Sequence, residues 1–272
     1  MRPGILTLTT DFGAHGPYVA AMKGIILGLA PEVKLVDVCH AIAPQNILEG
    51  AFVLASIVDA FPPGTVHLAV IDPGVGTDRR MVAARVAGQW FVLPDNGLLS
   101  GVLRGRTLEE VRELSNPRLR RPIVSNTFHG RDIMAPAAAH LLRGGDPAEL
   151  GPLRDKVVKL ANFNSREHLV GDTFRGFIGE VIFRDTFGNL ITNVTGDQLR
   201  SKGHHTWTIQ IGDETFTGPL HRTYGEEPPG SLIALEGSTG FIEVAVVNGD
   251  AARQLTVGPG ATVCFSIGDE PR

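Results

Sequence analysis

The segment from Ala69 to Arg80, AVIDPGVGTDRR, combines residue types that could do chemistry. Asp72 follows an apolar run over residues 67–71, which is typical of a buried strand. A carboxylate at the end of a buried parallel strand lies where open α/β sheets bind ligands. Arg79 adds a fixed positive charge a short turn later. The segment indicates either a ligand site or an ordinary Asp-Pro-Gly turn with a surface arginine, and its spacing alone does not decide between them.

Three further stretches place polar groups beside glycine where loops are expected: TTDFG (9–13), NTFHGRD (126–132) and DTFGN (185–189). The first two are expected at strand ends in the first half of the chain, where they could meet the 72–80 turn. Each has a structural alternative. Asp11 could cap its own turn, His129 could be a structural or surface histidine, and Asp185 could start a turn.

The first half alternates strand and helix patterns. Periodicity predicts strands over 5–10, 33–39, 67–71, 81–86, 90–93 and 111–114. It predicts helices over 18–30, 47–61, 98–103 and 132–142. This alternation favours an α/β domain with a mostly parallel sheet and helices on both faces, in a Rossmann-like layering. No G-x-G-x-x-G follows the first strand, so a dinucleotide cofactor is not expected.

The composition changes after the last predicted helix. Residues 145–165 are rich in proline, glycine and charge, so we expect domains over 1–158 and 159–272. Strand patterns then recur at 176–183, 190–194, 206–211, 214–217, 231–235, 241–247 and 261–267. They predict a small antiparallel barrel or sandwich, with no helix beyond short turns such as 196–200.

Overall charge and hydropathy exclude several classes of protein. The net charge of −4 argues against a nucleic-acid-binding surface. The short run RLRR at 118–121 is expected to be a solvated loop, with a phosphate- or nucleic-acid-binding role as the less favoured alternative. No segment has the uninterrupted apolar length of a membrane span, and the N-terminus lacks a signal-peptide core. We therefore expect a cytoplasmic protein that does not enter a membrane.

Histidines and acids raise the alternative of a metal site. His40, His67 and His129 could combine with Asp11 and Asp72, but neither H-x-E-x-H nor C-x-x-C spacing is present. Strand alternation would also turn His67 and Asp72 to opposite faces. We expect no metal and no other cofactor.

Seven motifs, taken together and in order, resemble the S-adenosylmethionine hydroxide adenosyltransferases, the S-adenosylmethionine hydrolases related to the fluorinase and chlorinase. They are TTDFG (9–13), YVAAMKG (18–24), IDPGVGTDRR (71–80), PDNG (94–97), TFHGRDIMAP (127–136), DTFGNLITN (185–193) and GSTGFIEVAV (237–246). The resemblance implies an α/β domain followed by a small β-barrel domain. It also implies a homotrimer whose sites lie between the N-terminal domain of one subunit and the C-terminal domain of the next. The implied reaction converts S-adenosyl-L-methionine and water to adenosine and L-methionine.

The family's catalytic aspartate, arginine and histidine correspond to Asp72, Arg79 and His129 in this chain. The nucleophile would be water, with a pKa of about 15.7, attacking the saturated C5′ of the ribose. The leaving group is a neutral thioether, so neither a general acid nor an oxyanion hole is needed. We expect Arg79 and His129 to support the hydroxide character of an oriented water. Asp72 would orient one of them or accept the proton.

The resemblance also implies substrate-binding residues. Asp11 would accept hydrogen bonds from the ribose diol, and Asp185 would contact the methionine ammonium. Adenine and methionine would be held by a further C-terminal set: Phe187, Asn189, Tyr224, Ser238 and the backbone near Val246. One departure is visible, because Gly16-Pro17 stands where the family has an aspartate before its first helix.

Two other functions stay open: a halide-using 5′-halo-adenosine synthase and a non-catalytic adenosine- or S-adenosylmethionine-binding module. In the fluorinase, a tyrosine replaces the acid found here at Asp72, and an extra loop is present for which residues 85–103 leave no room. A binding module would need Asp11 and the C-terminal pocket but not the catalytic trio. The hydrolase is favoured because all three trio residues are present.

Overall fold

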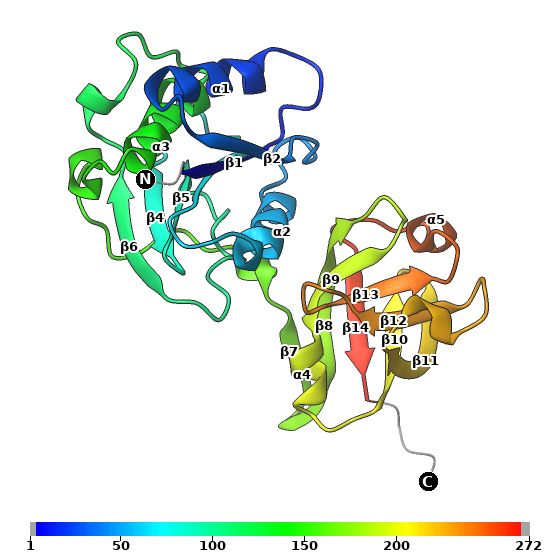
Figure 1. Ribbon diagram of the computed structural model, residues 1–272. Coiled ribbons are helices and arrows are strands. Elements are labelled where there is room, and N and C mark those ends of the chain that lie inside the picture. The colour runs from blue at the N-terminus through cyan, green and yellow to red at the C-terminus, as the bar shows by residue number, and fades with distance from the viewer. Residues whose placement is uncertain (1–3, 268–272) are drawn as a thin grey trace. The chain divides into compact units, whose positions relative to one another are not determined.

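The computed structural model describes residues 4–267 and divides into two units, of which one ends at Leu160 and the other begins at Ala161 (Figure 1). Each unit has its own sheet and its own apolar core. Within residues 4–267, every helix is too short or too polar to cross a membrane.

The N-terminal unit is built on a six-stranded sheet of order β2-β1-β3-β5-β4-β6. Its strands are β1 (Ile5–Thr10), β2 (Lys34–Cys39), β3 (Val66–Val70), β4 (Met81–Val86), β5 (Gln89–Pro94) and β6 (Leu108–Glu113). The pairs β1–β2, β1–β3 and β3–β5 are parallel, whereas β4 runs antiparallel to both β5 and β6. The sheet is therefore mixed, and the Rossmann-like layering stays a prediction.

A tight turn accounts for the antiparallel part of the sheet. Ala87 and Gly88 join β4 to β5, with φ of 51° and 69°. Two consecutive positive φ values are typical of the two-residue hairpin turn, which reverses the chain within one strand spacing.

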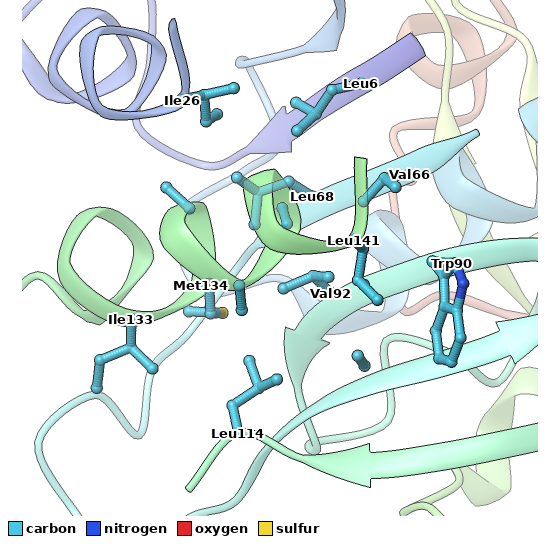
Figure 2. Packing of buried hydrophobic residues seen from close by; sticks show 14 of the residues in the cluster. Leu6, Ile26, Val66, Leu68, Trp90, Val92, Leu114, Ile133, Met134 and Leu141 are labelled. Carbon is cyan, nitrogen blue, oxygen red and sulfur yellow. The ribbon is translucent and has the colours of Figure 1, made fainter. Parts of the chain in front are cut away.

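Helices pack against the strands through two separate apolar clusters. Helices α1 (Tyr18–Leu29) and α3 (Ala135–Leu142) share one cluster with the sheet, and α2 (Ile47–Ile57) shares the other. Figure 2 shows the first cluster, in which Leu6 and Leu68 of neighbouring strands lie close to Ile26, Met134 and Leu141. β1 and β3 are adjacent and parallel, with Thr10 opposite Val70. The loops that follow these strands, carrying Asp11 and Asp72, consequently start at the same edge of the sheet.

Several predicted helices differ in detail. Residues 98–103 form a series of turns instead of a helix, with the Ser100 N–H donating to the Gly97 carbonyl at 3.0 Å. The helix predicted over 47–61 is α2 followed by a 3₁₀ turn at Val58–Ala60. The helix predicted from residue 132 begins as a π-helix, Gly130–Met134, and continues as α3, which places His129 at its N-cap.

The C-terminal unit is a closed barrel. Its strands follow the order β14-β10-β11-β12-β13-β9-β8, and a further β14–β8 pairing closes this ring of seven. They are β8 (Thr173–Arg184), β9 (Leu190–Thr195), β10 (Thr206–Ile211), β11 (Glu214–His221), β12 (Leu232–Glu236), β13 (Phe241–Val246) and β14 (Thr262–Ser266). The prediction of a small β-barrel is confirmed, although β11 and β12 pair in parallel.

The sequence patterns did not predict two elements of this unit. The strand β7 (Arg166–Val170) pairs with the edge of β8, and the short helix α5 (Ala251–Leu255) follows β13. The Asp250 side chain caps α5 by accepting from the Arg253 N–H at 2.8 Å. Helix α4 (Gly196–Arg200) was expected only as a short turn, and a capping box between Thr195 and Gln198 stabilises it.

Candidate active site

Asp72, Arg79 and His129 lie in direct contact. Arg79 Nε donates to Asp72 Oδ1 at 2.7 Å, and Arg79 Nη2 donates to Oδ2 of the same carboxylate. The same Nη2 lies 2.9 Å from His129 Nδ1. The side chains of Asp72 and Arg79 are 5% and 11% exposed. The structure thus brings together the three predicted catalytic side chains from two loops far apart in the sequence.

Gly76 explains how these two loops come so close. Its φ is 83°, and a Cβ at this position would lie 2.5 Å from the carbonyl oxygen of Asn126. The turn between Asp72 and Arg79 therefore packs directly on the loop that leads to His129. A side chain at position 76 would strain the turn and push the two loops apart.

The contact with Arg79 defines the state of the His129 ring. A guanidinium has donors only, so Nδ1 must be the acceptor of this hydrogen bond. Burial lowers the pKa of His129, and the charge of Arg79 lowers it further against the opposing effect of Asp72. The imidazole is therefore neutral near pH 7 and carries its proton on Nε2, which makes Nε2–H the donor of the ring.

A cavity of about 310 Å³ connects two of these residues with the predicted ribose-binding acid. Its lining includes Asp72, His129 and Asp11. One oxygen of Asp11, Oδ2, accepts the backbone N–H of Gln45 at 2.8 Å, which fixes the carboxylate at the cavity wall. Gln45 also lines the cavity. Its φ is positive, at 64°, and the pattern of residue types in the sequence does not predict this backbone conformation.

Aromatic rings surround the same loops. The rings of Phe12, Tyr18 and Phe128 form a cluster with centroids 5.5–5.8 Å apart, and Phe12 and Phe128 line the cavity. The guanidinium of Arg131 lies 4.8 Å from the centre of the Phe128 ring. Such faces suit a heterocyclic base or a sulfonium cation. No role was assigned to these rings from the sequence, although Phe12 follows Asp11 and Phe128 precedes His129 directly.

His40 supports the loop that carries Asp11. Its Nδ1 lies 2.9 Å from Thr10 Oγ1, its Nε2 lies 3.0 Å from Asp37 Oδ1, and its carbonyl accepts the Gly13 N–H at 2.7 Å. One ring nitrogen thus contacts the end of β1 and the other contacts β2, while the backbone carbonyl holds the turn after β1. His40 is a structural partner of the site and does not line the cavity.

His67 is part of the core. Its Nδ1 lies 2.7 Å from Thr7 Oγ1 and its Nε2 lies 2.6 Å from Gln89 Oε1, and burial lowers its pKa to about 4. Within residues 4–267, no three histidine, cysteine, aspartate or glutamate side chains are placed to hold a metal ion.

In the C-terminal unit, Asp185 organises the turn that precedes β9. Its Oδ1 accepts the backbone N–H groups of Phe187 and Asn189 at 2.9 and 2.8 Å, and its Oδ2 accepts from Asn189 Nδ2 at 2.8 Å. This turn leaves the Phe187 ring 75% exposed. Three of the predicted substrate-binding residues, Asp185, Phe187 and Asn189, therefore belong to one hydrogen-bonded turn, and the Phe187 side chain is exposed.

Glu243 contacts Tyr224 and the turn that carries Ser238, and the sequence patterns did not single it out. The Tyr224 hydroxyl donates to Glu243 Oε2 at 2.6 Å, and burial together with the charge of Asp185 raises the pKa of Glu243. A Cβ at Gly237, next to Ser238, would collide with Glu243 Oε1. The available signal was a charged residue inside the apolar run FIEVAV, where every position is buried.

Ser238 and Val246 lie at opposite ends of β13. Ser238 is exposed in the turn before the strand, and Val246 is buried at its end. Leu190 pairs with Val244, so Val246 is at the same end of the barrel as the Asp185 turn. Ser238 lies near the Glu243 carboxylate and not beside Val246.

Comparison with protein families gives two matches that together span most of the chain. A family model described as "SAM hydroxide adenosyltransferase N-terminal domain" matches residues 6–151. A second, described as "SAM hydroxide adenosyltransferase C-terminal domain", matches residues 179–264.

Known relatives match along almost the whole chain. An (R)-S-adenosyl-L-methionine hydrolase from Salinispora arenicola is 38% identical, covering 97% of this chain and 98% of the relative. The protein of the same name from Thermus thermophilus is also 38% identical, over 97% and 99% of the two chains. A fluorinase from Nocardia brasiliensis is 29% identical over 98% of each chain. The crystal structure of an uncharacterized conserved protein from Thermotoga maritima has a TM-score of 0.87 at 33% identity, over 97% of this chain and 100% of that chain.

Proposed function

This chain belongs to the SAM hydroxide adenosyltransferase family, and from this we propose that it hydrolyses S-adenosyl-L-methionine to adenosine and L-methionine. The observation that carries the proposal is the Asp72–Arg79–His129 contact, beside a cavity that also holds Asp11. Its hydrolase-named relatives are 35–38% identical over nearly the full length, whereas the fluorinase is more distant at 29%.

The reaction is a displacement at C5′ of the ribose. Water forms the new C5′–O bond as the C5′–S bond breaks. The electron pair of that bond goes to sulfur, so the sulfonium leaves as the neutral thioether of methionine. One proton is lost from water. Since the positive charge on sulfur disappears, the protein need not stabilise a developing anion on the leaving group.

We assign the proton to Asp72. His129 Nδ1 is occupied by Arg79, whereas each carboxylate oxygen of Asp72 keeps a second lone pair after accepting from Arg79. His129 orients the water by donating from Nε2–H, and the fixed charge of Arg79 supports the growing hydroxide character. Orientation of this kind lowers the barrier because the reacting atoms are held in place before the bond forms.

We propose that substrate recognition is shared between the two units. In the N-terminal unit, Asp11 binds the ribose hydroxyls, and the Phe12 and Phe128 rings face the sulfonium. Methionine and adenine contacts come from the C-terminal unit, with Asp185 and Glu243 offering acidic groups to the ammonium. The rest of this set is Phe187, Asn189, Tyr224, Ser238 and the backbone at Val246. Gly16-Pro17 supplies no carboxylate to this arrangement.

We further propose that the chain forms a homotrimer in which each site joins the N-terminal domain, predicted from the sequence over residues 1–158, to the C-terminal domain of the next subunit. A mixing experiment tests this arrangement. Asp72→Ala and Asp185→Ala subunits are each expected to be inactive alone, and co-assembled subunits should regain activity at the sites that carry neither change. No recovery in verified mixed oligomers would contradict it. A cytoplasmic location stays a prediction.

The hydrolase is tested by incubating the pure protein with S-adenosyl-L-methionine, with and without chloride. Adenosine and L-methionine are expected in equal amounts in both conditions, and an Asp72→Asn variant should form far less. Formation of 5′-chloro-adenosine would indicate the halogenase instead. Binding of S-adenosyl-L-methionine without any product would indicate a non-catalytic module.

A further inference from the structure

A second cavity, of about 440 Å³, lies between α1, α3 and the loop around residues 118–122. It shares no lining residue with the cavity of the proposed active site. Its volume falls in the range of about 300–1,000 Å³ that is usual for small-molecule sites. The family function leaves this cavity unexplained.

Four arginines line this cavity, and no aspartate or glutamate is among its described lining residues. They are Arg118, Arg120, Arg121 and Arg143. The sequence predicted that the run at 118–121 is a solvated loop. Arg118 is exposed as expected, and Arg120 and Arg121 are partly buried where they line the cavity. The loop turns its charge toward a hollow because Arg121 is anchored, its N–H donating to the Asp132 carbonyl at 2.9 Å.

Most of this positive charge is not neutralised. Arg121 pairs with the buried Asp132 at 3.0 Å, whereas within residues 4–267 the Arg120 side chain has no ion-pair partner and donates to the Leu114 carbonyl at 2.8 Å. The Nε of Arg120 is buried and has no hydrogen-bond partner. Arg118 and Arg143 are exposed, and neither side chain has an ion-pair partner in the described part of the chain. Because this Nε is covered by protein, the exposed guanidinium groups of Arg118 and Arg143 are the donors open to an anion in the cavity.

The other walls of the cavity are apolar. They are formed by Ile25 and Leu29 of α1, by Leu119 of the loop and by Pro136 of α3. His140 closes one side, with its Nε2 3.0 Å from the Asp146 carbonyl and 3.4 Å from Glu149 Oε2. An apolar floor beneath unpaired guanidinium groups suits a ligand with two parts, an anionic head and an apolar body.

We propose that this cavity is a binding site, separate from the active site, for a small phosphate ester that carries an apolar or aromatic body. A guanidinium presents paired donors that match two phosphate oxygens, and three of the four arginines have donors to spare. The net charge of the whole chain is −4, so the positive charge is local to this cavity. A compact anion fits such a site better than an extended polyanion does.

Calorimetric titration with phenyl phosphate tests the proposal. Adenosine and L-methionine are kept saturating, so that the proposed active site is occupied. One phenyl phosphate is expected to bind per chain. Inorganic phosphate should bind about tenfold more weakly because it lacks the apolar body, and phenol should show no saturable binding. Equal affinity for inorganic phosphate and phenyl phosphate would overturn the role of the apolar wall.

Two charge-matched variants locate the binding. Arg118→Ala/Arg143→Ala removes two exposed arginines of the cavity and should weaken phenyl phosphate binding about tenfold or more. Lys156→Ala/Lys159→Ala removes two exposed lysines elsewhere in the same unit and should leave the affinity unchanged. Unaltered binding by the arginine variant, or equal loss in both variants, would overturn the proposal. The readout is binding and not turnover, so either result leaves the hydrolase proposal standing.

Discussion

One guanidinium nitrogen, Nη2 of Arg79, lies 2.9 Å from Nδ1 of His129. The same guanidinium holds both oxygens of Asp72, so a single side chain fixes the other two members of the trio. The arginine also determines which nitrogen of the histidine carries the proton. The loop after β3 and the loop before α3 are thereby joined at the cavity that holds Asp11.

Replacing Arg79 by lysine should distinguish the effect of its positive charge from the effect of its hydrogen-bonding geometry. Lysine keeps the positive charge but cannot donate in parallel to Asp72 and also reach His129. We expect kcat to fall about 10²-fold with a small change in KM, measured by steady-state kinetics. The matched control is Arg80→Lys, since Arg80 donates through Nε and Nη2 to the single oxygen Asp95 Oδ2 and lies outside the trio. Wild-type kcat in Arg79→Lys would contradict the assignment.

The activity should fall on the acid side of neutrality. Burial and the charge of Arg79 lower the pKa of His129, so the ring is neutral above its usual value of about 6.5. As the pH falls through the lowered pKa, a proton arrives on Nδ1 and displaces the bond from Arg79. The kcat/KM should therefore be level above this region and decline below it. An NMR titration of the His129 ring should give the same pKa, and a ring pKa above 6.5 would contradict this account.

His67 should make stability depend on pH. Its folded-state pKa of about 4 lies below the unfolded value of about 6.5, so the unfolded state binds the proton more readily. The stability is fully present above the unfolded pKa and is lost as the pH falls toward 4. This group should contribute about 3 kcal/mol less at pH 4 than at pH 7. Urea unfolding of the wild type and of His67→Gln at both pH values measures the difference, and equal pH dependence in the two proteins would refute it.

Glu243 should matter for substrate affinity. Glu243→Gln keeps the size of the side chain and its contact with Tyr224 but removes the negative charge beside Asp185. If the two acids hold the methionine ammonium, KM should rise about tenfold with less change in kcat. Glu227→Gln removes an exposed charge of the same unit and serves as the control. An unchanged KM in Glu243→Gln would exclude the acid from substrate binding.

Gly76 should be needed for activity as well as for stability. Gly76→Ala places a Cβ against the Asn126 carbonyl, so it should separate Arg79 from His129 and reduce kcat about tenfold or more. Gly64→Ala is the control, because Gly64 has a similar φ of 87° but nothing within 4 Å of its Cβ position. Both variants should lose about 1–3 kcal/mol of stability from backbone strain. Equal kcat in the two variants would contradict the role of Gly76.

Local patterns in the sequence accounted for most strands and for the polar loops. The predicted bounds of β1, β9 and β10 lie close to the observed ones because all three segments are rich in β-branched residues, and β10 also alternates between exposed and buried positions. The sequence predicted strands at 81–86 and 90–93 on either side of Gly88, and the structure shows them paired as the antiparallel β4–β5 hairpin, with Ala87 also at positive φ. Residues 98–103 have an apolar pattern that is typical of a helix, but the structure buries these apolar side chains in a series of turns.

The residues of the candidate site also fall into two groups: those that the motifs point to, and those whose role depends on contacts between distant segments. Asp72, Arg79 and His129 could be predicted because motif order along the chain pointed to them, and the structure adds their contact. The charge of Glu243 inside an apolar run was visible, but its importance depends on contacts with Tyr224 and Gly237, which are distant or have no local pattern. The charge of the Arg118–Arg121 run was visible, but the hollow it faces is formed by α1 and α3 and has no local signal.

The most direct test of the central claim is the fate of the oxygen atom of water. The protein is incubated with S-adenosyl-L-methionine in water enriched in oxygen-18, and both products are analysed by mass spectrometry. Attack at C5′ predicts adenosine with the label in its 5′ hydroxyl and unlabelled L-methionine. Labelled homoserine with 5′-methylthioadenosine, or no labelled adenosine at all, would contradict hydrolysis at C5′.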